Sequence, residues 1–234
     1  MLDDIKKAPY YSLRIQPATG CSLTIATARS IVQKDAVRMR GWDFPHYFED
    51  SVGNAQTYLF NATSWSGHVE LWRLYRSGQF LYIGAPWDLG MDHQERMMTE
   101  FRNSVFIRNA SQKDEVIGVM SFVGMIYSIT EFHLFAARFG KSLDVTDFAL
   151  DIGLHNIENW GLVPGEPSVP WHSVLRAKVK SIRIPSPNAQ AVFEDPITTS
   201  AEALKEIFEC FDWENSDGAI RSWQERFVAG RFAY

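Results

Sequence analysis

The feature that most constrains this chain is an uncharged run in its middle. Fifteen residues, 116–130, carry no charged side chain and lie between Glu115 and Glu131. A bilayer takes about 20 residues to cross, so this run is too short to span one. A segment that is apolar on most sides has to be buried. We therefore expect a long core helix over residues 111–139 that ends before Gly140.

A β-hairpin is the clearest local pattern. Residues 68–75 and 79–85 are rich in β-branched and aromatic side chains and flank a turn at Arg76-Ser-Gly78. In the first arm, Val69 and Leu71 alternate with His68, Glu70 and Trp72. Because strand side chains alternate between faces, this predicts one apolar face and one face of polar or aromatic groups.

The remaining elements follow from periodicity and from Gly, Pro and capping residues. Strands are predicted over residues 10–16, 57–63, 105–108, 145–154 and 174–184, and helices over residues 24–39, 88–102, 201–211 (capped by Ser200) and 217–228. This order predicts an α+β fold: a mixed or antiparallel sheet packed by a long buried helix, in the form of two β-α-β-β units, followed by two C-terminal helices. Residues 1–190 would form the core domain and residues 191–234 a helical pair docked on the same body, with residues 185–199 as the linker.

Charge and cysteine content narrow the classes of function. A net charge of −5 disfavours a protein whose whole surface binds phosphates. Two cysteines, Cys21 and Cys210, cannot form a disulfide framework or a four-thiolate zinc site. The N-terminal residues carry acids where a secretory signal needs bases. A cytoplasmic location without a membrane partner is expected.

The densest group of reactive side chains is Arg40-Gly-Trp-Asp-Phe-Pro-His46. Asp43 could orient His46 as a general base, or both could meet a metal ion. The alternative is a structural turn in which Trp42 and Phe44 enter the core and Arg40 pairs with Asp43.

This segment, together with the hairpin sequence over residues 70–80, resembles a group of uncharacterised bacterial proteins. In those proteins similar stretches sometimes accompany a Schlafen/AlbA-type nucleic-acid-binding domain. The resemblance implies a nucleic-acid partner and carries over no catalytic residue.

A second candidate pair is His68 with Glu70, which share a strand face and could form an acid/base pair or chelate an ion. A solvent-facing cross-strand pair is the alternative. The chain has no His-Glu-x-x-His, Cys-x-x-Cys, phosphate-loop, dinucleotide-binding or nucleophile-elbow pattern. No metal site and no cofactor are therefore predicted.

Basic and aromatic residues suggest binding surfaces. Arg176, Lys178 and Lys180 alternate along a predicted strand, with Arg183 nearby, and could follow a phosphate backbone. A solvated or lysine-protected sheet edge is the alternative. Trp72 and Tyr75 could stack on bases, and Arg40 and Trp42 could join them, although core packing or a protein interface explains aromatic residues equally well.

These observations favour a binding, accessory or sensor module of a bacterial cytosolic system over an enzyme. Its expected partners are a protein and, as a further option, a nucleic acid or nucleotide, and it could form a homo-oligomer. The alternative is a hydrolytic enzyme such as a nuclease, which would use His46 with Asp43 or His68 with Glu70.

Overall fold

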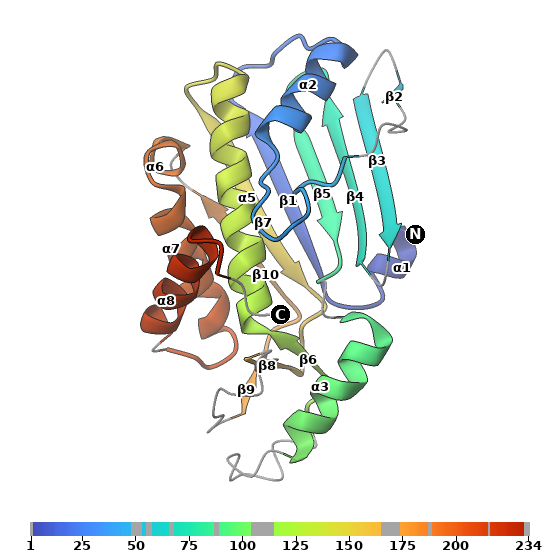
Figure 1. Ribbon diagram of the computed structural model, residues 1–234, viewed down its shortest axis with the longest axis vertical. Coiled ribbons are helices and arrows are strands. Elements are labelled where there is room, and N and C mark those ends of the chain that lie inside the picture. Colours follow the sequence, from blue (N-terminus) through green and yellow to red (C-terminus); the bar gives the residue numbers. More distant parts are fainter. Residues whose placement is uncertain are drawn as a thin grey trace.

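The α+β class is confirmed. The computed structural model describes residues 2–47, 53–54, 58–65, 68–86, 89–103, 115–164, 174–186, 189–214 and 216–231. It contains a seven-stranded antiparallel sheet, a small mixed sheet and a layer of helices (Figure 1). None of the described helices is long and apolar enough to cross a membrane.

The large sheet collects strands from both halves of the chain. Its order is β10-β7-β1-β5-β4-β3-β2. The strands are β1 (Tyr10–Pro17), β2 (Gly53–Asn54), β3 (Tyr58–Trp65), β4 (His68–Tyr75), β5 (Phe80–Gly84), β7 (Phe148–His155) and β10 (Ser181–Ser186). The predicted hairpin is confirmed in β4 and β5, and Gly78 takes the positive φ of 84° that its turn requires.

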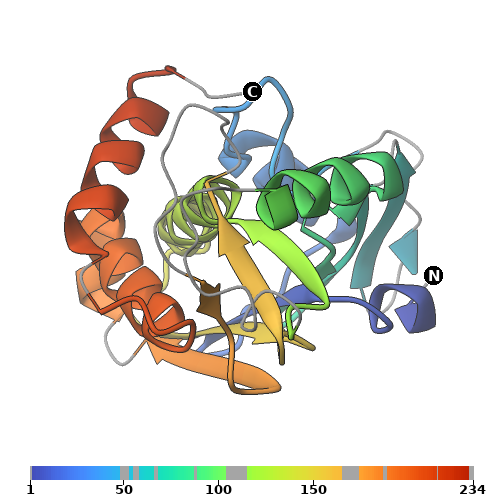
Figure 2. The ribbon, with the colours of Figure 1, turned by 90° about the horizontal axis from the view of Figure 1, so that it is seen from below.

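The helices lie on one face of this sheet. Helix α5 (Phe122–Ser142) runs along the sheet beside α2 (Ile25–Asp35), and three further helices pack around α5: α6 (Ala189–Glu194), α7 (Pro196–Glu209) and α8 (Asp217–Val228) (Figures 1 and 2). The short α1 (Leu2–Ile5) lies at a corner of the sheet, and α3 (Met91–Asn103) packs against β6 (Gly118–Ser121). The described residues contain no further α-helix. We call the face of the sheet that α2 and α5 do not cover the outer face.

The uncharged run forms a strand and then a helix, so the prediction of one continuous helix is wrong at its start. Strand β6 pairs in parallel with β8 (Trp160–Val163), and the helix begins only at Phe122. Ser121 caps it, because its Oγ accepts a hydrogen bond of 3.1 Å from the Gly124 amide. The burial expected for the run is confirmed except at Ile117, which is 66% exposed, and nearly the whole of α5 is buried.

The predicted strand over residues 174–184 is broken into two. β9 (Leu175–Arg176) joins β6 and β8 in the small sheet, whereas β10 pairs with β7 in the large one. The second β-α-β-β unit is likewise divided, because β7 enters the large sheet beside β1 while β6 and β8 pair elsewhere. The two halves of the chain therefore share a sheet instead of forming separate units.

The ends of several elements differ from the sequence expectation. Helix α2 stops at Asp35, because Val37 forms an isolated bridge with Phe44. The expected linker, 185–199, contains α6 and the start of α7. Asp195, not Ser200, caps α7 by accepting a 3.0 Å bond from the Thr198 amide. The predicted strand over residues 105–108 lies outside the described residues.

Candidate functional site

The segment after α2 folds back against the buried side of the sheet. Val37 and Phe44 exchange backbone hydrogen bonds of 2.8 and 2.9 Å, and Gly41 supplies the positive φ of 85° in the turn between them. Phe44 is buried among aromatic rings of β5 and α5, including Tyr82 at 5.1 Å and Phe132 at 4.9 Å between centroids. The expectation that Phe44 enters the core is confirmed, and Trp42 is half-buried.

Arg40 forms a buried ion pair with Glu131 in the middle of α5. The Arg40 Nε donates to Glu131 Oε1 at 3.0 Å, and its Nη2 contacts Glu131 Oε2. The two side chains are 9% and 0% exposed. Burial raises the pKa of Glu131, although the charge of Arg40 acts in the opposite direction. Arg40 also lies 5.3 Å from the ring centroid of Trp42. The expected pairing of Arg40 with Asp43 is wrong.

His46 pairs with Glu70 of β4. Its Nδ1 lies 3.0 Å from Glu70 Oε2, and its backbone amide donates to Glu70 Oε1 at 2.8 Å. Burial alone would lower the pKa of His46, but the hydrogen bond and the charge of Glu70 outweigh it and raise that pKa. The His46 carbonyl accepts bonds from Asn61 Nδ2 at 2.8 Å and Trp72 Nε1 at 2.7 Å. Three side chains of β3 and β4 therefore hold His46 in place.

The predicted pairing of Asp43 with His46 does not form. Asp43 lies in an ion pair of 2.7 Å with Arg38, so it does not orient His46. Glu70 lies on the buried face of β4 with Trp72, whereas Val69 and Leu71 are half-buried on the outer face. The apolar residues of β4 thus do not mark its core face, since ion pairing lets Glu70 be buried. The side chain of His68 lies outside the described residues.

The predicted stacking surface is divided between faces. Trp72 is fully buried and packs on Phe80, with ring centroids 5.8 Å apart, so it cannot stack on a base. Tyr75 is half-buried and lies on the outer face of the same strand. For Trp72, the aromatic pattern of the hairpin sequence therefore reflected core packing.

The predicted basic stripe does not form one strand face. Arg176 lies in β9, Arg183 in β10, and Lys178 and Lys180 between them. Arg176 pairs with Glu115, Lys178 with Asp212 at 2.6 Å, and Arg183 with Asp151 at 2.9 Å. The predicted stripe does not form because residues 177–180 connect the small sheet to the large sheet.

Sequence reasoning missed Glu131 as the partner of Arg40. The signal was present, because Glu131 directly follows the uncharged run and lies within a helix that has to be buried. A buried carboxylate needs a cation or several hydrogen bonds. Arg40 is 91 residues away in sequence, so only the fold identifies it.

This arrangement can fix a loop, but it offers little to a substrate. The charged groups of Arg40, Glu131 and Glu70 are buried and already paired. Within the described ranges, no three histidine, cysteine, aspartate or glutamate side chains lie close enough to share a metal ion. No family model, curated protein or solved structure matches the chain.

Proposed function

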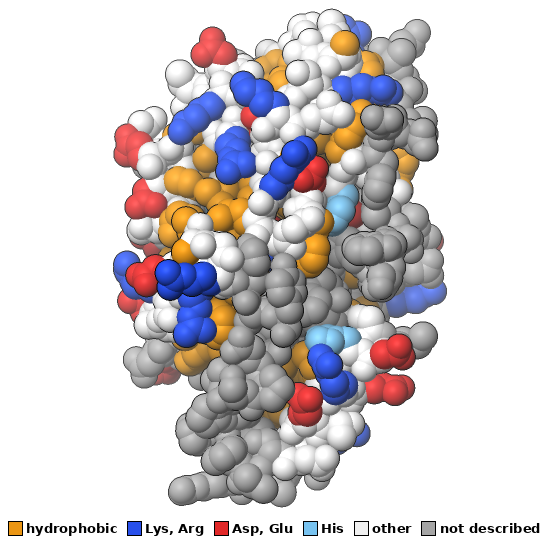
Figure 3. Space-filling view, in the orientation of Figure 1, with side chains coloured by type: hydrophobic (Ala, Val, Ile, Leu, Met, Phe, Trp, Pro, Cys, Tyr) orange, Lys and Arg blue, Asp and Glu red, His pale blue; other side chains and the backbone are white. Residues whose placement is uncertain are grey.

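We propose that this protein is a binding module that docks a helical segment of a partner protein between α7 and α8. The observation that carries the proposal is a groove of about 400 Å³ between these helices. Its walls are formed by Ile197, Thr198, Ala201, Arg221, Gln224, Glu225, Val228 and Ala229. Figure 3 shows hydrophobic side chains at the surface in this region, with both acidic and basic side chains at its left edge.

The groove has an apolar edge and a fixed floor. Val228 is a large apolar side chain with 49% of its surface exposed. Gln224 is buried, and its amide nitrogen donates to Ser200 Oγ at 2.8 Å and Thr130 Oγ1 at 3.2 Å. These bonds tie α8 to α7 and α5. The groove is therefore preformed, which lowers the entropy cost of binding.

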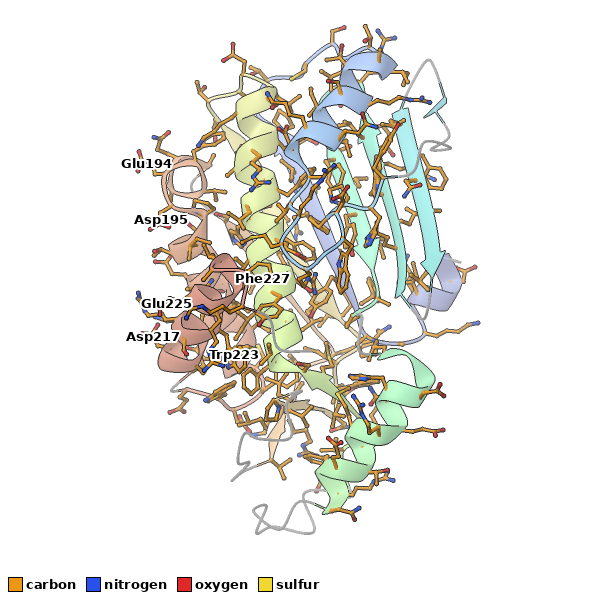
Figure 4. All side chains as sticks on the ribbon, viewed as in Figure 1. Glu194, Asp195, Asp217, Trp223, Glu225 and Phe227 are labelled. Carbon is orange, nitrogen blue, oxygen red and sulfur yellow. The ribbon has the colours of Figure 1, made fainter. Side chains whose placement is uncertain are left out.

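The charge of the C-terminal helices indicates the kind of partner that the groove would bind. Residues 189–234 contain nine acidic and four basic residues, which accounts for the whole net charge of −5. The basic wall residue Arg221 is engaged by Asp217 at 3.3 Å. Figure 4 shows Glu194 at the end of α6, Asp195 at the start of α7 and Glu225 on α8 toward the outside of this helical layer, whereas Phe227 points toward α5. We therefore expect an amphipathic partner helix with an apolar stripe and basic flanks.

The acid/base candidates are already paired with other side chains, which also supports binding over hydrolysis. Glu70 holds His46, and Arg38 holds Asp43, so these groups have structural partners.

A photo-crosslinking residue in place of Val228 tests the proposal in cells of the source organism. Ile117, which is 66% exposed and lies outside the groove, provides the matched control position. We expect a dominant crosslinked protein at position 228 that is absent at position 117. The crosslinked peptide should be basic and amphipathic.

The same peptide, made synthetically, should bind the purified chain. Val228→Asp should weaken this binding by at least about tenfold, since a charge would enter the apolar contact. Identical products at both positions, a crosslink only to a second copy of the chain, or a peptide that does not bind would each overturn the proposal.

A further inference from the structure

The outer face of the large sheet carries a compact cluster of polar and aromatic groups on β1, β7 and β10. The register places Ser12 opposite Gly153, and Gly153 opposite Arg183. Arg14 lies opposite Asp151, and Tyr10 opposite His155. Because side chains alternate along a strand, all of these positions point to the same face. That face is the one turned away from α2 and α5 (Figures 1 and 2).

One carboxylate holds two arginines on this face. Asp151 Oδ2 accepts a bond of 2.8 Å from Arg14 Nε and lies 2.9 Å from Arg183 Nη2. Although burial raises the pKa of Asp151, the two arginines lower it further, so the carboxylate stays ionised near neutral pH. The arginine side chains are 44% and 62% exposed. The trio has a net positive charge, and its guanidinium groups retain N–H donors for an anion.

A stacked ring pair lies beside the arginines. The rings of Tyr10 and His155 are 4.6 Å apart and 24° from parallel. Ser12 Oγ lies 2.9 Å from His155 Nε2. Gly153 makes this approach possible, because a Cβ there would come within 2.5 Å of both Ser12 Oγ and His155 Nε2. Burial, followed by the nearby Lys6, lowers the pKa of His155. The imidazole is therefore neutral at neutral pH and available for stacking.

The charge distribution lets an anion approach this face. Since residues 189–234 account for all of the net negative charge, residues 1–188 are balanced, with nineteen acidic and nineteen basic residues. The acidic helices α7 and α8 pack against α5, on the other side of the sheet.

We propose that the outer-face cluster, Tyr10, Ser12, Arg14, His155 and Arg183, binds single-stranded nucleic acid. Arg14 and Arg183 contact phosphates, and an unpaired base extends the Tyr10–His155 stack. Stacking on a sheet requires unstacked bases, which excludes a duplex. This site is separate from the groove between α7 and α8.

Fluorescence anisotropy with a labelled oligouridylate of about 12 nucleotides tests the site, because a single binding surface of this kind covers about 4–16 nucleotides. A duplex of equal length and polyglutamate serve as competitors. We expect saturable binding of the single strand that neither competitor displaces. Two phosphate contacts predict a loss of affinity of about sevenfold between about 50 and 200 mM salt.

Variants separate the two contact types. Arg14→Gln with Arg183→Gln should weaken binding and flatten its salt dependence. Tyr10→Ala should weaken binding by at least about fivefold and leave the salt dependence unchanged. Arg38→Gln is the matched control, since Arg38 is 67% exposed and paired with an aspartate, as Arg183 is.

Several outcomes would overturn the inference. Equal competition by duplex would show general polyanion binding, and equal competition by polyglutamate would point to an acidic protein partner. An equal loss of affinity in the Arg38→Gln control, or no saturable binding by the folded chain, would also refute it. Circular dichroism of each variant confirms that the fold is kept.

Discussion

The buried pair of Arg40 and Glu131 makes a quantitative prediction. Glu131→Gln removes the carboxylate charge that is paired with the buried Arg40 guanidinium, which is 9% exposed. Removing one partner of a buried pair costs about 3–5 kcal/mol. For a chain of this size each kcal/mol lowers the melting temperature by about 2–4 °C, so a decrease of about 6–20 °C is expected.

A double variant distinguishes an uncompensated charge from lost packing. Arg40→Met with Glu131→Met removes both charges and keeps similar side-chain volume, and such replacements are often neutral or stabilising. We expect the free energy of unfolding of the double variant to return to within about 1 kcal/mol of the parent chain or to exceed it.

Urea unfolding followed by tryptophan fluorescence and by circular dichroism measures the stability of the parent chain and of both variants. The reasoning is refuted if Glu131→Gln costs less than about 1 kcal/mol, or if the double variant is as unstable as the single one.

Two further predictions concern pH and packing. The raised pKa of His46 predicts a contribution to stability that is complete below about pH 6.5 and is lost as the pH rises through the folded-state pKa. The urea midpoint of the parent chain should therefore fall over that pH range, whereas that of Glu70→Gln should not. His133 has the opposite effect on stability, because burial lowers its pKa to about 4 and its contribution to stability is lost as the pH falls from about 6.5 to 4. A urea midpoint that does not change with pH would contradict both assignments. Gly140→Ala should destabilise the fold by about 1–3 kcal/mol despite better helix propensity, since the new Cβ would come within 2.6 Å of Phe193 and 2.9 Å of Phe148. Gly218→Ala, with no heavy atom within 4 Å of its Cβ, should instead be neutral or slightly stabilising in thermal melts, and the same sign for both substitutions would show that packing does not decide the effect.

Local sequence signals predicted the elements that local physics controls. The hairpin followed from strand-forming residues on both sides of a turn with glycine, and α8 was predicted with its observed bounds. Errors arose where pairing with a distant segment competed with local preference. Gly118 and its neighbours became a strand because Trp160 and its neighbours offered a parallel partner.

The candidate site shows the same division. The sequence identified Arg40, His46 and Glu70 as chemically capable residues, but it paired His46 with Asp43 and Glu70 with His68. The structure pairs His46 with Glu70 because the segment after α2 folds over β4. The outer-face cluster was also hidden, since Ser12 and His155 are 143 residues apart.

The sequence by itself therefore determined the α+β class, the hairpin, the buried central run and the amphipathic C-terminal helices. These depend on side-chain periodicity, turn residues and caps, which act over a few neighbouring positions. Only the tertiary structure decided which face of β4 is buried and which distant charges meet. The reason is energetic: a buried charge is tolerated only beside its counterion, and the fold alone brings Glu131 to Arg40 and Glu70 to His46.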